Sequence, residues 1–455
     1  MKLTRAAAGL TTPRERMVHL GLGAFFRAHQ AWYTNQVDAE SKWGYVAFTG
    51  RSADAANLLQ TQDGLYTLIT RSPLGDEFEV INSIARAEDG NDLTALTEAI
   101  VSEQTALVTL TVTEAGYSID AAGLLIDAET QLEQLTSGKP TTVLGRLAWA
   151  LNQRRLKTQL GLALVPCDNI PANGHLLATA MEQLFEAFGG EALAWLRAEV
   201  SFVSTSIDRI TPKTTEADVQ EVAASTGWQD ASPVVTEPFR DWVLQGEFPL
   251  GRPAWEEAGA RFVAQIEPFE NRKLWLLNGA HSLLAYLGQL RGHQTVAQAI
   301  DDLECLEQVT QFWDEAQRTL NNSELQVETY RQALLERFRN PRIAHQLSQI
   351  AIDGATKVRV RTVPTALAEL ELGNSAQGAA NVMSAWIAFR LKNQNAQDAM
   401  QQQIEDALEQ AAGDHHAQIA SLLALLDSRL ANHPQFLERV IAQVNLLTQT
   451  DKEPV

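Results

Sequence analysis

The chain has 455 residues, of which 45% are hydrophobic and 20% charged, and its formal net charge at pH 7 is −20. This length is expected to fold as two domains, and the acidic excess argues against nucleic acid or an anionic membrane as a partner. There is no long apolar run, no signal-peptide pattern and only two cysteines, Cys167 and Cys305. We therefore expect a cytoplasmic protein with neither a transmembrane helix nor a disulfide framework nor a thiolate zinc site.

Short strand-like runs alternate with helix-like stretches through the first half of the chain. The runs begin at residues 17, 44, 78, 106, 160 and 201, and the stretches include 91–103, 141–157 and 174–188. Such alternation is typical of a doubly wound, mostly parallel sheet. We predict an α/β, Rossmann-like dinucleotide-binding domain over residues 1–262.

From about residue 270 the pattern changes to long segments with helical periodicity and almost no strand signal. Examples are 296–319, 328–351, 375–393 and 399–431. We predict a mainly α-helical domain over residues 263–455 that contributes the substrate and catalytic residues.

The first expected strand leads into a Gly-x-Gly turn, at Gly21 and Gly23. Such a turn between a strand and a helix lets the backbone approach a pyrophosphate and directs the helix N-terminus at it. Phe26 replaces the third glycine of the usual fingerprint, so a tight turn without a ligand is the alternative. We predict that the cofactor is bound by Gly21, Gly23, Ala24 and Phe25.

Two residues after the second expected strand point to different cofactors. An acidic residue there can bind the ribose hydroxyls and select NAD, whereas an arginine can favour the 2′-phosphate of NADP. Asp54 lies where a helix would begin, and Arg51 lies just before it. We expect NAD, with NADP as the less favoured alternative.

Residues 273–281, Lys-Leu-Trp-Leu-Leu-Asn-Gly-Ala-His, set three polar side chains in an apolar run. On a helix of about 100° per residue, Lys273, Asn278 and His281 fall within one sector. The apolar residues cover most of the circumference, which indicates burial, although an amphipathic helix with a solvated polar edge is the alternative. Buried polar groups need hydrogen-bond partners, so the segment favours a site.

Other dehydrogenase chemistries fit the sequence poorly. None of the six tyrosines has a lysine four residues later, as a short-chain dehydrogenase requires, and the two cysteines are isolated. Lys273 is therefore the best candidate for a general base, because burial lowers the pKa of a lysine toward the working pH. We expect no catalytic metal.

The chain resembles the long-chain mannitol dehydrogenase family, which includes mannitol 2-dehydrogenases, arabinitol dehydrogenases and fructuronate reductases. The resemblance implies a reversible, metal-independent transfer of hydride between a secondary alcohol and a nicotinamide cofactor. It rests on a series of motifs in the order of the family, at residues 19–30, 111–117, 167–174, 208–212, 237–239, 251–255, 273–281 and 353–357.

The resemblance also implies a role for each matching residue. Lys273 matches the general base, Asn169 and Asn278 match two amides that hold the reacting oxygen, and His281 matches a histidine that orients substrate and lysine. The remaining matches are Asp208 as a substrate contact, Glu270 as a proton relay to solvent, and Glu114 at the cofactor.

The substrate-binding positions differ from those of polyol-oxidising members. Such members have an arginine at the position of Gln349 and an aspartate at that of His345, whereas fructuronate reductases resemble this chain there and have an arginine at the position of Arg361. A cation at Arg361 could pair with a carboxylate or phosphate; the alternative is that Arg359 and Arg361 form a solvated pair on a strand or loop.

We therefore expect an NAD-dependent enzyme that interconverts a linear polyol and its ketose, of the mannitol and fructose type. The alternatives are a fructuronate reductase, a sugar-phosphate dehydrogenase of the mannitol-1-phosphate type and, more remotely, a non-catalytic dinucleotide-binding sensor. The expected partners are small molecules (a polyol, a ketose or a sugar acid), and the expected oligomeric state is a monomer or a weak homo-oligomer.

Overall fold

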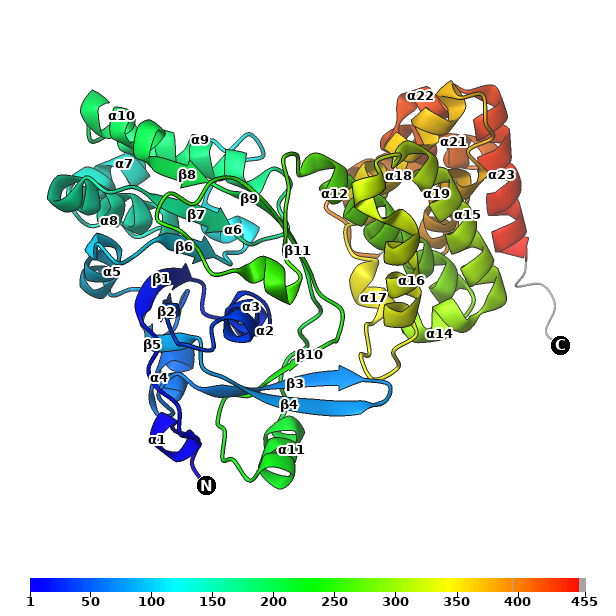
Figure 1. Cartoon of the computed structure of the whole chain (residues 1–455). Coiled ribbons are helices and arrows are strands. Elements are labelled where there is room, and N and C mark those ends of the chain that lie inside the picture. Colours follow the sequence, from blue (N-terminus) through cyan, green and yellow to red (C-terminus); the bar gives the residue numbers. More distant parts are fainter. Residues whose placement is uncertain (395, 450–455) are drawn as a thin grey trace. The chain divides into compact units, whose positions relative to one another are not determined.

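The computed structural model describes residues 1–394 and 396–449, which belong to two units, Met1–Glu267 and Pro268–Val455 (Figure 1). The main sheet of unit 1 has six parallel strands in the order β5-β2-β1-β6-β7-β8. Numbered along the chain within this sheet, the order is 3-2-1-4-5-6, which is that of doubly wound dinucleotide-binding folds. The strands are β1 (Glu15–Leu20), β2 (Gly44–Phe48), β5 (Ile84–Glu88), β6 (Leu107–Leu110), β7 (Leu162–Pro166) and β8 (Val200–Phe202).

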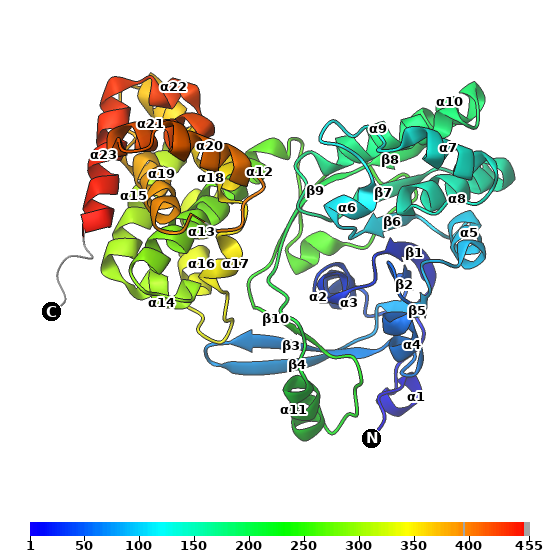
Figure 2. The ribbon, with the colours of Figure 1, turned by 180° about the vertical axis from the view of Figure 1, so that it is seen from behind.

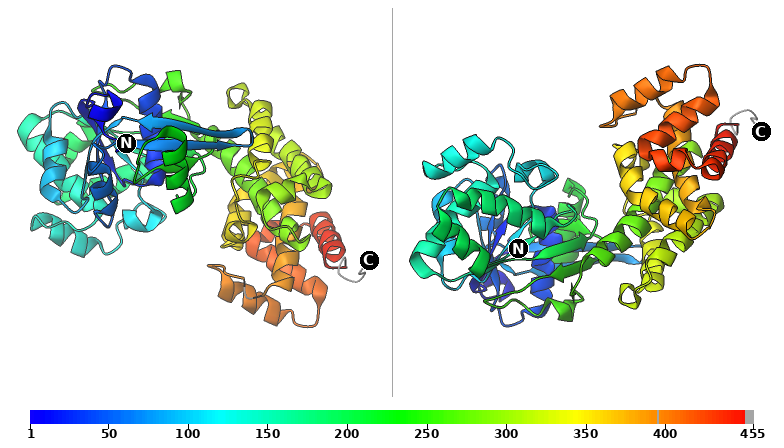
Figure 3. Two further views of the ribbon diagram at one scale, coloured as in Figure 1. Left: turned by 90° about the horizontal axis from the view of Figure 1, so that it is seen from below. Right: turned by 90° about the horizontal axis from the view of Figure 1, so that it is seen from above.

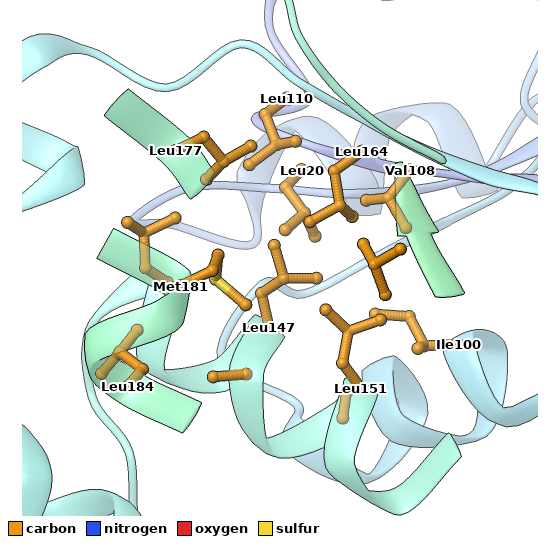
Figure 4. Close-up of a cluster of buried hydrophobic side chains, with 14 of the residues drawn as sticks. Leu20, Ile100, Val108, Leu110, Leu147, Leu151, Leu164, Leu177, Met181 and Leu184 are labelled. Atoms are coloured by element: carbon orange, nitrogen blue, oxygen red, sulfur yellow. The ribbon is translucent and has the colours of Figure 1, made fainter. Parts of the chain in front are cut away.

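Successive residues of these strands face opposite sides of the sheet, and each side is covered by helices (Figure 3). Val18 and Leu20 of β1 join one apolar cluster, whereas Met17 joins the other. Figure 4 shows Leu20 and Leu164 packed against Leu147 and neighbouring helical side chains. The first cluster is built on α5 (Leu93–Val101), α8 (Val143–Thr158), α9 (Asn173–Glu186) and α10 (Gly190–Glu199), and the second on α2 (Ala24–Ala28), α3 (Gln30–Val37) and α4 (Asp54–Gln60).

Two smaller sheets complete the strands of unit 1. One is β10-β3-β4, in which β3 (Tyr66–Ser72) and β4 (Gly75–Ile81) form an antiparallel hairpin, and β10 is Val234–Thr236. The other is β12-β11-β9, with β9 (Ser204–Asp208), β11 (Asp241–Gln245) and β12 (Arg261–Phe262). The remaining helices are α1 (Arg5–Ala8), α6 (Glu114–Tyr117), α7 (Ala128–Thr136), α11 (Glu216–Thr226) and the 3₁₀ turn η1 (Trp255–Ala258).

The prediction of a Rossmann-like domain followed by a helical one is confirmed, and each expected strand run contains a strand, but two of the runs lie wholly or partly outside the main sheet. The run at residue 78 lies in the β3–β4 hairpin, and the third strand of the main sheet is β5. The run at residue 201 is divided between β8 and β9, which belong to different sheets. Strand periodicity alone does not identify the partner strand, because every half-buried strand shows the same alternation.

Unit 2 is helical (Figure 2). Its central helix is α19 (Gln377–Lys392), in which residues 378–390 are all buried, and it packs against α15, α18 and α23. The other elements are α12 (Glu267–Arg272), the π-helical turns η2 (Lys273–Gly279) and η3 (Leu284–Gly288), α13 (Ala280–Leu283), α14 (Val296–Asp301), α15 (Leu303–Thr319), the 3₁₀ turn η4 (Ser323–Leu325), α16 (Val327–Phe338), α17 (Leu347–Ile350), α18 (Gly354–Glu371), α20 (Gln401–Gln410), α21 (His415–Leu426), α22 (Ser428–Ala431) and α23 (Pro434–Gln449).

Some helical boundaries in unit 2 differ from the sequence prediction. The segment 328–351 is not one helix, because α16 ends at Phe338 before Pro341, which disfavours helical backbone in the residue before it. The segment carrying Arg359 and Arg361, for which a strand or loop was the alternative, lies inside α18. Within the described residues, no helix is both long and apolar enough to cross a membrane.

Candidate active site

A cleft of about 360 Å³ lies at the carboxyl ends of the central strands of unit 1. Leu20 and Phe48, the last residues of β1 and β2, line it together with the residues that follow these strands and with Gly90 and Thr111, which come shortly after β5 and β6. In doubly wound sheets this edge, where the strand order reverses, is where ligands bind.

The turn after β1 brings the main chain to the edge of this cleft. Gly21 has φ +108°, and a Cβ atom there would lie 2.4 Å from the carbonyl oxygen of Thr111. Its amide donates to the carbonyl oxygen of Phe48 at 2.9 Å, and its own carbonyl accepts from the Thr111 hydroxyl at 2.9 Å. The position therefore requires glycine for both conformation and space, and this close-approach geometry is that of a dinucleotide turn.

The helix after the turn explains why the third glycine of the fingerprint is absent. Gly23 is the N-cap residue of α2, which is only five residues long. Phe26 is buried within α2, and its ring stacks on His19 of β1 with centroids 3.5 Å apart. In the usual fingerprint a glycine at this position lets the helix pack closely on the sheet. Here the contact between Phe26 and His19 joins the helix to the sheet instead.

The expected cofactor residues are only partly found in the cleft lining. Gly21 and Arg51 line it, whereas Gly23, Ala24, Phe25 and Asp54 do not, and Asp54 is exposed on the first turn of α4. The side chain of Glu114 lies outside the part of the chain that the structure describes. Sequence reasoning missed Arg146 of α8, which lines the cleft and donates to Asn91 Oδ1 at 3.2 Å. No local motif marks this arginine, because it reaches the cleft from a helix nearly a hundred residues after Arg51.

The loop that follows β7 carries Asn169, which is exposed. Asn173 secures this loop: its Oδ1 accepts from the Thr205 amide at 2.9 Å, and its Nδ2 donates to the Thr205 carbonyl at 3.0 Å and to Asp168 Oδ1 at 3.3 Å. The Tyr117 hydroxyl donates to Asp168 Oδ2, and burial, followed by the charge of Asp168, raises the pKa of Tyr117. The loop is thus held on both sides of Asn169.

Asp208, expected as a substrate contact, ends the neighbouring strand β9 and is partly exposed. Asn173, which fastens the Asn169 loop, bonds Thr205 three residues earlier on the same strand. Asn169 and Asp208 therefore project from two connected segments of unit 1.

In unit 2, Lys273 and Asn278 lie on the π-helical turn η2, not on an α-helix. An amide of a π-helix bonds the carbonyl five residues earlier, so side chains five apart lie on the same side. Lys273 and Asn278 have this spacing, and both are partly exposed, while Leu276 and Leu277 between them are buried. The helical wheel at 100° per residue placed these two side chains farther apart than the observed turn does.

Contacts from other helices accompany this widened turn. A Cβ atom on Gly279 would lie 2.4 Å from a ring carbon of Phe312, so only glycine lets α15 approach here. Trp313 Nε1 donates to the carbonyl of Leu276 at 2.7 Å, and Arg361 donates to the carbonyl of Asn278 at 3.2 Å. Donors that reach the helix backbone from outside are a recognised cause of such irregularities, which are frequent at functional sites.

His281 follows the turn on α13 and is buried, with 8% of its surface exposed. Burial, followed by the charges of His345, Arg337 and Arg361, holds the pKa of His281 well below its usual value, so the ring is neutral at physiological pH. The rings of His281 and His345 meet edge to face with centroids 5.1 Å apart. Among the described residues, neither ring nitrogen of His281 has a hydrogen-bond partner, which leaves both for a ligand.

The residues of unit 2 that were expected to relay the proton or to contact the substrate differ in their position and exposure. Glu270 lies on α12 three residues before Lys273, in a helix that continues into η2, so the two share one helix face. Arg361 donates to Ser282 Oγ at 3.0 Å, and burial lowers its pKa to about 10. Gln349, in contrast, is exposed on α17.

A second cation accompanies Arg361 on the same helix face. Lys357, one turn earlier on α18, donates to the carbonyl of Ile350 at 3.3 Å. Burial, followed by the charge of Arg361, lowers the pKa of Lys357. Within residues 1–394 and 396–449, Arg361 forms no ion pair with a carboxylate, and no group of three or more His, Cys, Asp or Glu side chains is arranged to hold a metal ion.

Comparison with protein families gives two matches that together span most of the chain. The model described as the mannitol dehydrogenase Rossmann domain matches residues 15–257, and that described as the mannitol dehydrogenase C-terminal domain matches residues 265–448. Among curated proteins, the chain is 35% identical to the D-mannonate oxidoreductase of Escherichia coli over 386 residues, covering 82% of this chain and 79% of that protein. It is 37% identical to the D-arabinitol 4-dehydrogenase of Ralstonia nicotianae over 360 residues, covering 77% of each.

Among solved structures, the chain is similar to the ternary complex of Pseudomonas fluorescens mannitol 2-dehydrogenase with NAD and D-mannitol. The TM-score is 0.79 at 31% sequence identity, and the match covers 99% of this chain and 97% of that one.

Proposed function

This chain belongs to the mannitol dehydrogenase family, and we propose that it is an NAD-dependent oxidoreductase that interconverts a linear polyol and its ketose. The observation that carries the proposal is the polar group on the widened helix of unit 2. Lys273 and Asn278 share one side of η2, and His281 follows with both ring nitrogens available. A dinucleotide cleft alone would fit many functions, whereas a lysine, an amide and a neutral imidazole on one helix fit the chemistry of a secondary alcohol.

In the oxidation direction, Lys273 in its neutral form accepts the hydroxyl proton of the substrate. A nicotinamide dinucleotide held at the Gly21 turn would supply the hydride acceptor for the carbon that bears this hydroxyl, so that a ketone would be formed. The amide of Asn278 donates to the reacting oxygen and polarises it without competing for the proton, and the family resemblance assigns the same task to Asn169. Glu270, on the face of Lys273, passes the proton on to solvent.

The neutral state of His281 suits it to orient the substrate. A neutral imidazole both donates and accepts hydrogen bonds, so it can contact a hydroxyl group and the lysine at once. A protonated imidazole could donate but could accept no hydrogen bond. The desolvation that keeps His281 neutral therefore supports its role.

The cleft of unit 1 fits a nicotinamide dinucleotide. At Gly21 there is no room for a side chain, and the main chain there lies at the edge of the cleft, as a pyrophosphate-binding turn requires. The NAD present in the mannitol 2-dehydrogenase complex supports NAD as the cofactor.

One observation favours a second candidate substrate, a sugar acid or a sugar phosphate. Arg361 is partly buried, contacts the backbone of Asn278 and lacks a carboxylate partner among the described residues. A partly desolvated guanidinium without a counter-ion is less stable than a paired one, and an anionic substrate group would supply the partner. The similarity to a D-mannonate oxidoreductase is in keeping with this candidate.

The test is NADH oxidation by the purified protein with fructose, xylulose, fructuronate, tagaturonate and fructose 6-phosphate. Reduction of a neutral ketose as the best substrate supports the polyol dehydrogenase. A preference for the charged ketoses supports the second candidate, and no turnover of any of them, with NADH still bound, contradicts the proposed activity.

A further inference from the structure

Two neighbouring residues of α15 contact the helix that carries the side chains assigned to catalysis. The ring of Phe312 occupies the space that a side chain at Gly279 would need. Trp313 Nε1 donates to the carbonyl oxygen of Leu276 at 2.7 Å. The same carbonyl accepts from the Ala280 amide, which belongs to the helix itself. The indole therefore supplies an additional bond that holds the turn η2 from outside the helix.

Trp313 also supports the histidine that follows this turn, through one intermediate ring. Phe338, the last residue of α16, packs against His281 with ring centroids 4.9 Å apart and planes inclined by 37°. Phe338 in turn packs against Trp313, with 6.3 Å between the centroids. All three side chains are buried, and close-packed buried rings transmit a displacement to their neighbours. A shift of Trp313 would therefore reach His281 as well as η2.

The part of α15 that follows Trp313 is itself fastened to two other helices. The two carboxylate oxygens of Glu315 accept from two successive main-chain amides at the start of α19, at 2.7 and 2.9 Å. Arg318 Nε donates to a carboxylate oxygen of Glu369 on α18 at 2.8 Å. Because both carboxylates are buried and paired in this way, Trp313 stands on a firmly held segment and can serve as a fixed support for the turn that it contacts.

We propose that Trp313 is a positioning residue, because it holds the widened form of η2 on which Lys273 and Asn278 share one side. Through Phe338 it also fixes the orientation of His281. Groups that act together on one substrate need to be held within about 0.5 Å of their working geometry. The inference rests on the proposed function, because it concerns how the residues assigned to that function are held in place.

Trp313→Phe tests the proposal, because it removes the indole donor and keeps an aromatic ring. With the ketose that the wild type reduces best, kcat is expected to fall about tenfold or more, while the affinity for NADH stays close to that of the wild type. Trp195→Phe is the matched control, because Trp195 Nε1 donates to the main-chain oxygen of Gln159 at 3.1 Å, in unit 1. It loses the same kind of hydrogen bond, so it should lower the melting temperature and leave kcat unchanged.

Phe338→Leu tests the contact with His281 and leaves the indole in place. Because His281 is assigned to orienting the substrate, KM for the ketose should rise severalfold while kcat falls less. This division between KM and kcat differs from the one expected for Trp313→Phe. A KM equal to that of the wild type would overturn the part of the proposal that concerns His281.

A double-mutant cycle with Asn278→Ala separates positioning from general destabilisation. If Trp313 acts through the turn, Trp313→Phe should lower kcat less in the Asn278→Ala background than in the wild type. Fully multiplicative losses would overturn the proposal, as would an unchanged kcat in Trp313→Phe or an equal fall of kcat in Trp195→Phe. Failure of the proposed function would look different, because Asn278→Ala and Lys273→Ala would then both keep the turnover of the wild type.

Discussion

The guanidinium of Arg361 donates a hydrogen bond to the main-chain carbonyl oxygen of Asn278 over 3.2 Å. This contact joins the middle of α18 to the widened turn that carries Lys273. It ties a cation that could select the substrate to the backbone of a residue expected to hold the reacting oxygen. Under the proposed function, specificity and catalysis in unit 2 would therefore depend on one local structure.

Lys273→Ala is expected to lower kcat by about two to four orders of magnitude, the range typical of a lost general base. The affinity for NADH should change little, because the cleft proposed to bind it lies in unit 1. Stopped-flow hydride transfer and fluorescence titration of NADH measure the two quantities. Lys273→Arg should be equally inactive, because a guanidinium keeps its proton at the working pH; near-normal turnover of either variant between pH 7 and 9 would refute the assignment.

Arg361→Ala should reduce kcat/KM for a sugar acid or sugar phosphate by about 10²- to 10³-fold, and for a neutral ketose far less. The measured quantity is the ratio of kcat/KM for the charged substrate to kcat/KM for the neutral one, because loss of the hydrogen bond to Asn278 affects both substrates alike. Arg359→Ala is the control: its side chain points to the carbonyls of Leu425 and Leu426, at the end of α21. A wild type that prefers fructose, together with a silent Arg361→Ala, would leave the neutral polyol as substrate.

Gly21→Ala is expected to weaken NADH binding by roughly tenfold or more, because a positive φ in a non-glycine residue costs about 1–3 kcal/mol and the added methyl meets Thr111. Gly50→Ala is the control in the same cleft. It has no positive φ, and a Cβ atom there has open space around it. Equilibrium titration and thermal unfolding of both variants distinguish a lost cofactor turn from general destabilisation. If Gly21→Ala binds NADH as the wild type does, the turn does not contact the cofactor.

Acid should destabilise unit 1 partly through His19. Burial lowers the pKa of this residue to about 3, so its contribution to stability is complete above the unfolded value near 6.5 and is lost as pH falls from there toward 3. Within that window one proton is taken up on unfolding, which corresponds to about 1.4 kcal/mol per pH unit. In His19→Gln the unfolding free energy, measured in urea between pH 6 and 4, should depend on pH less steeply by that amount. Identical slopes would show that His19 does not titrate on unfolding.

Asn173→Ala should lower kcat by about tenfold or more while KM changes less, because the loop with Asn169 would lose its anchor to β9. The readout is the change in kcat relative to the change in melting temperature. Asn152→Ala is the matched control: this buried asparagine on α8 accepts a hydrogen bond from Arg155, and its loss should destabilise the protein without a comparable loss of kcat. If both variants lower kcat equally for the same loss of melting temperature, Asn173 has only a structural role.

The sequence by itself determined the broad architecture of this protein. Alternating strands and helices predicted the doubly wound sheet, because the two-residue and 3.6-residue periods record which faces are buried. The ordered motifs from residue 19 to 357 identified the family, and Gly21 was recognisable because a close backbone approach permits no other residue. These are properties of short segments, so they can be predicted from the local sequence alone.

Only the tertiary structure decided how the polar residues of unit 2 are presented. The turn η2 occurs where Gly279 admits Phe312 and where Trp313 and Arg361 donate to its carbonyls, so its shape depends on helices far along the chain. Arg146 likewise reaches the cleft from α8, with no motif to mark it. Local periodicity shows which side of a segment is buried, but not which other segment packs against that side. The packing segment determines whether a helix widens, as at η2, and which side chains, such as that of Arg146, line a cleft.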